Sequence, residues 1–528
     1  MNSNLKKSLI FLCVSIFCTA VFGVGVRWIY DSGIIYDKSS VVLLKLSQGF
    51  QIKQVITVVL LYIWGNCLLH IWQDEKDEKR LAILAFPFSV ASWCVGSFLI
   101  LIFGIPYNLI SMLILGIMVL SVSALIRKKT FDKDNLLEKI KYFNYFMGVT
   151  CIASVGLFFT SALSDVFYYN YQYGKQLAIL GAYDGEMMLY SLTRVGQMSP
   201  LLSSLAYFGG FDNINTINHM MMISMGCYLF NVLHDSNRDV NKKFLNVVGV
   251  IGLLSMTPYI LMAGMVSNNT MEMFAIIILS LGIYELGKKE DKITYIICVL
   301  FAIMTAMGRV EGGVYLVFLI GCSVILSLGR KKTLLYIWLP AVLIQTLYYM
   351  KLFVVMGIQF DEIYFVTEEN LIINLGVFAI GGICIVLIYH PIFKIIKKRI
   401  GVWIIGALIG INVLELLLDS DKYIYNIQMV LHNIFENDKG WQFCVWGITP
   451  WIVVCTLLLV AYMREITYFD LIWIGYVLLC VGVCWFREPL RSGFGDSANR
   501  MLMMILPIVV ISFVNKVSLF KNDNSNMR

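Results

Sequence analysis

The first residue in this sequence that suggests chemistry is an isolated carboxylate at the end of an apolar run. Asp165 follows the apolar run 144–163 and begins the tyrosine-rich segment DVFYYNYQYGK. A carboxylate at a membrane boundary is costly unless water or a partner group solvates it. A carboxylate within hydrogen-bond reach of a hydroxyl can also take up its proton. Asp165 is therefore a candidate general base, and a solvated helix end is the alternative.

Arginines near other run ends supply the opposite charge. Arg487, Arg491 and Arg500 lie within fourteen residues before the last apolar run, and Arg309 follows another run. Guanidinium groups bind phosphate and carboxylate oxygens through paired hydrogen bonds. Arginines at helix ends also snorkel toward the interface or pair with nearby acids. A phosphate-binding cluster and a set of structural arginines are both consistent with this pattern.

The composition determines the class of protein. Of the 528 residues, 59% are apolar and 14% are charged, and the mean hydropathy is +0.78. These values exclude a soluble globular protein and indicate an integral membrane protein. The thirteen cysteines form no CxxC pair and the five histidines show no HxxxH spacing, so a cysteine- or histidine-built metal site has no support.

Apolar runs long enough to cross a bilayer recur along the whole chain. The sequence predicts an all-α polytopic bundle of about sixteen transmembrane helices. We divide it into residues 1–143 with four spans and a basic linker, 144–515 as the core, and 516–528 as a tail. The predicted spans are 8–26, 52–71, 81–103, 107–126, 144–163, 214–233, 244–264, 271–287, 293–308, 312–328, 334–355, 371–390, 401–418, 445–462, 468–486 and 501–515.

The distribution of basic residues orients these spans. With strict alternation, 28 of the 41 Lys and Arg residues fall on one side, which the positive-inside rule identifies as the cytoplasm. Both termini are then cytoplasmic, and the long connections, including the loop 164–213, face outward. The net charge of +7 lies mostly in the cytoplasmic loops. It therefore gives no support to a nucleic-acid partner.

The start of the loop 164–213 has helical periodicity. Val166, Tyr169, Tyr173, Leu177 and Leu180 recur at spacings of three and four. This pattern predicts a helix that lies in the interface plane with its tyrosines at headgroup depth. An aromatic belt that only anchors the loop is the alternative.

Three stretches carry a resemblance to a known family. SDVFYYNYQYGK, MTAMGRVEGG at residues 304–313 and GDSANR at 495–500 are similar to motifs of the GT-C superfamily of membrane glycosyltransferases, especially bacterial relatives of family 39. The likeness covers roughly residues 144–515. It implies an inverting transfer of a sugar from a polyprenyl-phosphate donor to a cell-surface glycan, lipid or protein on the exoplasmic face.

The resemblance also implies roles for residues. Asp165 takes the place of the family's base or positioning carboxylate, and the need for a divalent metal stays open. Such a donor also requires cations beside its phosphate, for which the candidates are Lys175, Arg309, Arg487, Arg491 and Arg500. Residues expected to contact the substrates are Tyr168, Tyr169, Asp184, Glu186, Asn268, Glu272, Glu311 and Asp496.

Two other functions fit parts of the same pattern. A polysaccharide polymerase of the O-antigen kind would also use outward-facing arginines on a lipid-linked sugar. A flippase or transporter of lipid-linked sugars would be expected to carry repeats and charges near the bilayer midplane. Here the charges cluster at the rims, which favours the transferase.

Overall fold

The structure is a computed structural model. It describes residues 52–72, 78–127, 172–183, 197–209, 267–288, 291–308, 331–357, 400–435, 449–463, 466–486 and 504–526, with single positions between 217 and 232 and at 502. Every regular element in these ranges is a helix, so the all-α prediction is confirmed for this part of the chain. The helices are α3 Ile52–Trp72, α4 Glu78–Ile102, α5 Leu109–Arg127, α7 Gln172–Leu180, α9 Met198–Phe208, α13 Ser267–Lys288, α14 Lys292–Met307, α16 Lys331–Met350 with the π-helical turn η3 Lys351–Val355, α19 Ile400–Leu418, α20 Ser420–Phe435, α21 Thr449–Met463, α22 Tyr468–Phe486 and α24 Leu506–Asn526.

Four helical segments are long and apolar enough to cross a membrane: Arg80–Ile102, Leu109–Arg127, Leu335–Val355 and Gly401–Leu418. Helix α5 shows the expected consequence, because its apolar side chains Ile110 and Ile117 are 69% and 64% exposed. An apolar surface of this kind is stable against lipid and not against water. These helices indicate a membrane protein. The predicted spans 8–26, 144–163, 244–264, 312–328 and 371–390 lie outside the described residues, so the count of sixteen stays a prediction.

Side-chain caps explain where several helices begin. Helix α22 starts at the predicted residue because Thr467 and Asp470 form a reciprocal cap, in which the Thr467 amide donates to Asp470 Oδ2 at 2.8 Å. The Asp470 amide donates in return to Thr467 Oγ1 at 3.4 Å. Asp291 caps α14 by accepting from the Thr294 amide at 2.9 Å.

The last helix extends beyond the predicted span 501–515. Helix α24 begins at Leu506 and continues to Asn526, and its apolar part is Leu506–Val517, so the membrane boundary near residue 515 stays a prediction. Pro507, in the first turn, lacks the amide hydrogen that a helix start leaves unbonded anyway. From Lys521 to Asn526 every residue is polar, but polar residues do not end a helix. A hydropathy pattern detects the end of the apolar stretch and not the end of the helix.

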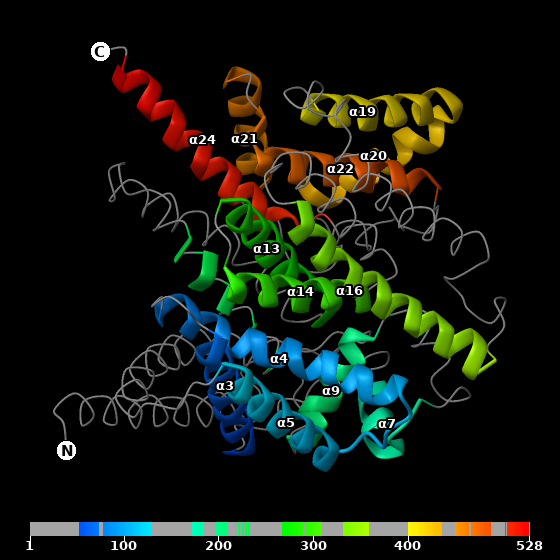
Figure 1. Ribbon diagram of the computed structural model, residues 1–528. Helices are drawn as coiled ribbons and strands as arrows, with labels where there is room; N and C mark the ends of the chain where they lie inside the picture. The colour runs from blue at the N-terminus through cyan, green and yellow to red at the C-terminus, as the bar shows by residue number, and fades with distance from the viewer. Residues whose placement is uncertain are drawn as a thin grey trace, which may run out of the picture.

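The helices form three tiers in Figure 1. Helices α3, α4, α5, α7 and α9 make the lowest tier, α13, α14 and α16 the middle, and α19 to α24 the uppermost. Helix α14 joins the lower two tiers because it packs against α3, α4, α13 and α16. Helix α22 packs against α19, α20 and α24 in the upper tier.

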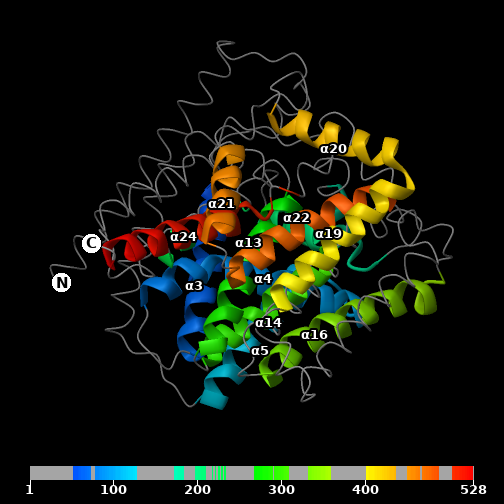
Figure 2. The same cartoon turned by 90° about the horizontal axis from the view of Figure 1, so that it is seen from above.

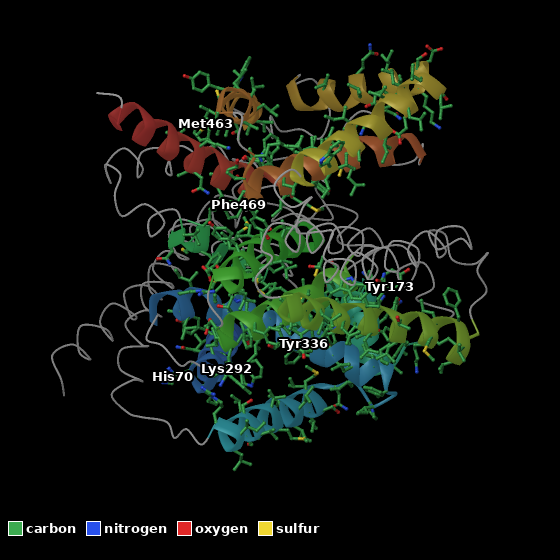
Figure 3. All side chains as sticks on the ribbon, turned by 45° about the horizontal axis from the view of Figure 1, so that its top comes forward. His70, Tyr173, Lys292, Tyr336, Met463 and Phe469 are labelled. Carbon is green, nitrogen blue, oxygen red and sulfur yellow. The ribbon has the colours of Figure 1, made fainter. Side chains whose placement is uncertain are left out.

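One end of the bundle, here named the Arg80 end, gathers charged residues. Arg80 pairs with Glu285 at 2.9 Å and donates to Thr294 Oγ1 at 3.1 Å. Arg127 donates to the Ile71 carbonyl at 3.4 Å. The Tyr284 ring stacks on Tyr468 at 5.6 Å and so brings the start of α22 to the same end. His70, Lys292, Met463 and Phe469 lie toward this end in Figure 3, whereas Tyr173 lies toward the other.

Candidate functional site

Most residues predicted for the site lie outside the described part of the chain. Lys175 is among the described residues and lies half-buried on α7. The backbone of α13 includes Asn268 and Glu272 in its first turns, so Asn268 belongs to a helix and not to the expected loop. The predicted site residues outside the described ranges are Asp165, Tyr168, Tyr169, Asp184, Glu186, Arg309, Glu311, Arg487, Arg491, Asp496 and Arg500.

The described parts of the predicted outer loop are two short helices packed together. Helix α7 crosses α9 at Gly174, where an added Cβ would lie 2.4 Å from the Pro200 carbonyl oxygen and 2.7 Å from the Ser204 amide nitrogen. Only glycine permits this approach. A helix is present over Gln172–Leu180, within the segment where the periodicity predicted one, and its place at the membrane interface stays a prediction. Leu177 is buried and Leu180 is 45% exposed.

Polar side chains on α9 are buried and bonded. The Ser203 hydroxyl donates to the Ser199 carbonyl at 3.0 Å, and the Ser204 hydroxyl donates to the Leu201 carbonyl at 2.7 Å. Because the Ser204 proton is used there, the 2.5 Å contact with Tyr107 has the phenol as donor. The hydroxyls therefore hold fixed orientations.

Tyr107 joins the turn between α4 and α5 to both short helices. Its amide donates to the Gly181 carbonyl at 2.8 Å, and its hydroxyl reaches Ser204 on α9. Burial raises the pKa of the Tyr107 hydroxyl to about 12, although the hydrogen bond with Ser204 lowers it. Tyr107 is thus a neutral donor at physiological pH. We call this side of the bundle the Tyr107 end.

The end of α14 reaches the same place. The Gln197 amide, at the start of α9, donates to the Met307 carbonyl at 2.9 Å. Met307 is the last residue of α14 and lies two positions before Arg309 in the chain. The structure therefore brings together two segments that the sequence singled out separately: the loop that follows Asp165 and the segment that precedes Arg309.

Three buried polar atoms at this corner have no hydrogen-bond partner among the described residues. They are the amide oxygens of Gln176 and Gln197 and the hydroxyl of Tyr183. The Tyr183 ring contacts Tyr348 of α16 at 6.4 Å between centroids. Burial raises the pKa of Tyr183 well above its usual value, with a smaller contribution from Tyr107. Unpaired buried groups are costly, so they are candidate contacts for a bound molecule that carries hydroxyls.

The sequence reasoning missed Tyr107, Gln176, Tyr183, Gln197 and Ser204. Most residues that it selected are charged, whereas all five of these are uncharged. Their burial depends on contacts between segments up to 97 residues apart, such as the one between Tyr107 and Ser204. The one local signal was that both glutamines lie close to apolar residues in the sequence. This signal does not distinguish a buried glutamine side chain from an exposed one.

A second buried polar group lies in the upper tier. Lys516 of α24 pairs with Asp470 of α22 at 3.0 Å, and both side chains are fully buried. The Ser512 hydroxyl donates to Asp470 Oδ1, and the Thr467 hydroxyl donates to Oδ2 at 2.7 Å. Every charge here is compensated, so the cluster is suited to holding helices together. The described residues include no group of three or more His, Cys, Asp or Glu side chains arranged for a metal.

Comparison with protein-family models, with curated proteins and with solved structures finds no match. The resemblance to GT-C glycosyltransferases therefore stays a prediction from the sequence motifs.

Proposed function

We propose that this protein is a membrane glycosyltransferase that moves a sugar from a polyprenyl-phosphate carrier to an acceptor on the outer face of the membrane. The observation that carries the proposal is the docking of α7 and α9 on the Tyr107 end of the bundle. This docking joins the segment after Asp165 to the end of α14 through the Gln197 to Met307 hydrogen bond. A transferase requires these segments to meet, because its base and its phosphate-binding cations act on one donor.

The contacts also support the predicted grouping of the helix ends, to which the positive-inside rule assigns a side. Charge counting assigns Arg80, Glu285, Asp470 and Lys516 to cytoplasmic ends, and the structure pairs them with one another. The same counting assigns Tyr107, Ser204 and Gln197 to the outer side, and they gather at the opposite end. Figure 3 has Lys292 toward one end and Tyr173 toward the other. The Tyr107 end would then be exoplasmic.

The proposed reaction is a single displacement. The Asp165 carboxylate takes the proton of an acceptor hydroxyl, and the acceptor oxygen attacks the anomeric carbon of the donor sugar. The bond from that carbon to the phosphate oxygen breaks, and polyprenyl phosphate leaves with the electron pair. Arg309, Arg487, Arg491, Arg500 and Lys175 are the candidates to stabilise the added negative charge. Attack opposite the leaving group inverts the anomeric configuration.

Substitution of Asp165 tests the proposal. Purified protein in liposomes is given a panel of polyprenyl-phosphate sugars with acceptor, and release of polyprenyl phosphate is measured. We expect Asp165→Asn to lower turnover on the order of 10²- to 10⁴-fold, because the amide cannot accept the proton. The matched control is Asp523→Asn on the last turns of α24, which should keep wild-type turnover.

The same liposomes separate the rival functions. Elongation of a repeat-unit chain on the carrier would replace the proposal with a polymerase. Intact carriers that cross the bilayer would replace it with a flippase. Equal turnover of wild type and Asp165→Asn would contradict the role of Asp165.

A further inference from the structure

A third buried polar cluster lies where α19, α20 and α22 meet. Helix α20 turns back from the end of α19, as Figure 2 shows. Asp419 caps α20 by accepting from the Lys422 amide at 3.2 Å. The turn brings Tyr423 of α20 over Asn412 and Glu415 of α19, and all three are buried.

Asn412 holds the cluster together. Its side-chain amide nitrogen donates to the Leu408 carbonyl at 2.8 Å and to the Leu478 carbonyl on α22 at 3.1 Å. Its amide oxygen accepts from the Tyr423 hydroxyl at 2.8 Å. One side chain therefore joins three helices. Both of its amide protons are used, so Asn412 has none to donate to Glu415.

Glu415 has no such partners among the described residues. The residue is 2% exposed, and neither carboxylate oxygen has a hydrogen-bond donor in the described part of the chain. The neighbouring apolar residues of α19 point away from the cluster, since Leu414 and Leu417 are 56% and 77% exposed. A buried carboxylate without donors is costly and uncommon in native proteins. The Glu415 side chain nevertheless points into the cluster and not to the exposed face of α19, so a group that binds it there is required.

The position of Glu415 along the bundle is known from contacts of α19 with α22. Gly401 lies against Leu471, and Asn412 bonds to Leu478, so the two helices run in the same direction. Helix α22 starts at the Arg80 end, as the stacking of Tyr284 on Tyr468 shows. Glu415 therefore lies toward the opposite end, which is the exoplasmic end in our proposal. It lies beside the last turns of α22, which ends at Phe486, directly before Arg487 in the chain.

A ligand that binds the Glu415 carboxylate must supply hydrogen-bond donors. A hard metal cation would need several oxygen ligands, and the Asn412 oxygen is already occupied by Tyr423. Two neighbouring hydroxyl groups match the two free oxygens of a carboxylate, and sugars carry such pairs. We propose that Glu415, held in place by Asn412 and Tyr423, is a recognition site for the vicinal hydroxyls of a sugar. This inference deepens the proposed function and, in naming the sugar as substrate, rests on it.

Binding can be measured without transfer. Full-length protein in nanodiscs is titrated with the methyl glycosides of glucose, galactose and mannose, and saturation-transfer difference NMR gives each affinity. We expect at least one glycoside to bind wild type, and Glu415→Gln to weaken that affinity about tenfold or more, because bonds to a charged acceptor are the stronger ones. Asp421→Asn on the exposed surface of α20 is the matched control and should bind as wild type does.

The outcomes distinguish the Glu415 sugar site from the proposed transferase function. Equal binding by wild type and Glu415→Gln, or no binding of any glycoside by wild type, overturns the site. Glu415→Asp guards against a folding artefact, because it keeps the charge and should retain more affinity than the glutamine variant. Glycoside binding that depends on Glu415, in a protein with no transferase activity in liposomes, would support the site and contradict the proposed function. Transferase activity with binding that is independent of Glu415 would do the reverse.

Discussion

At the scale of single residues, the close packing of α7 on α9 depends on Gly174. We expect Gly174→Ala to lower the apparent unfolding temperature, with a cost of about 1–3 kcal/mol, because the new methyl group meets backbone atoms of Pro200 and Ser204 that cannot rotate away. Thermal unfolding in nanodiscs measures the change. Gly406→Ala is the matched control, since nothing lies within 4 Å of its added Cβ. There the substitution should be neutral or stabilising.

The Tyr107 hydroxyl makes the stability of this corner depend on pH. Burial raises its pKa from the ordinary value of about 10 to about 12, so the folded state holds the proton more tightly than the unfolded state. The resulting stabilisation is complete below pH 10 and is lost as the pH rises toward 12. We expect Tyr107→Phe to be about 1 kcal/mol less stable than wild type at pH 7, because it lacks the bond to Ser204.

That difference should shrink and then reverse between pH 10 and 12, since phenylalanine has no proton to lose. Unfolding temperatures of both proteins across this range test the effect, and titration of lysines cancels in the comparison. A constant difference up to pH 12 would show that Tyr107 does not carry the dependence.

At the scale of elements, the Asp470–Lys516 pair joins α22 to α24. Removing one partner leaves the other charge buried and unpaired, which typically costs about 3–5 kcal/mol. We therefore expect Asp470→Asn and Lys516→Met each to lower the unfolding temperature strongly. The double variant should be more stable than either single variant, because it buries no net charge. Strictly additive losses would mean that the two residues do not interact.

The same pair shows what the sequence predicts at this scale. The start of α22 at Tyr468 was predictable, because a local cap at Thr467 and Asp470 coincides with the start of the apolar run. Lys516 was assigned to a polar tail, since hydropathy ends a span at the first charge. Lys516 is instead buried in α24, where it pairs with Asp470, which lies 46 positions earlier in the chain. Local signals thus predict helix starts, whereas charge pairing between distant segments is invisible to them.

The candidate site follows the same rule. Periodicity predicted a helix after Asp165, and α7 is present, but the buried groups around it depend on long-range contacts. Tyr107 comes from the turn between α4 and α5, Gln197 from the start of α9 and Glu415 from the last turns of α19. No local pattern indicates that Tyr107 is buried, or that the side-chain oxygens of Gln197 and Glu415 are buried without hydrogen-bond partners among the described residues.

At the scale of the whole molecule, the orientation of the bundle decides whether any of this chemistry faces outward. We expect a cysteine at Ile179, which is 61% exposed on α7, to react with a membrane-impermeant maleimide in intact cells. A cysteine at Lys292, exposed at the start of α14, should react only after permeabilisation. Labelling of the wild-type protein gives the background from its thirteen native cysteines. The reverse pattern would place the Tyr107 end in the cytoplasm, where a donor sugar presented on the outer leaflet is out of reach. The pairing of charged helix ends only groups those ends together, and the positive-inside rule alone assigns them to the cytoplasm, so a reversed result would contradict the rule and leave the pairing intact.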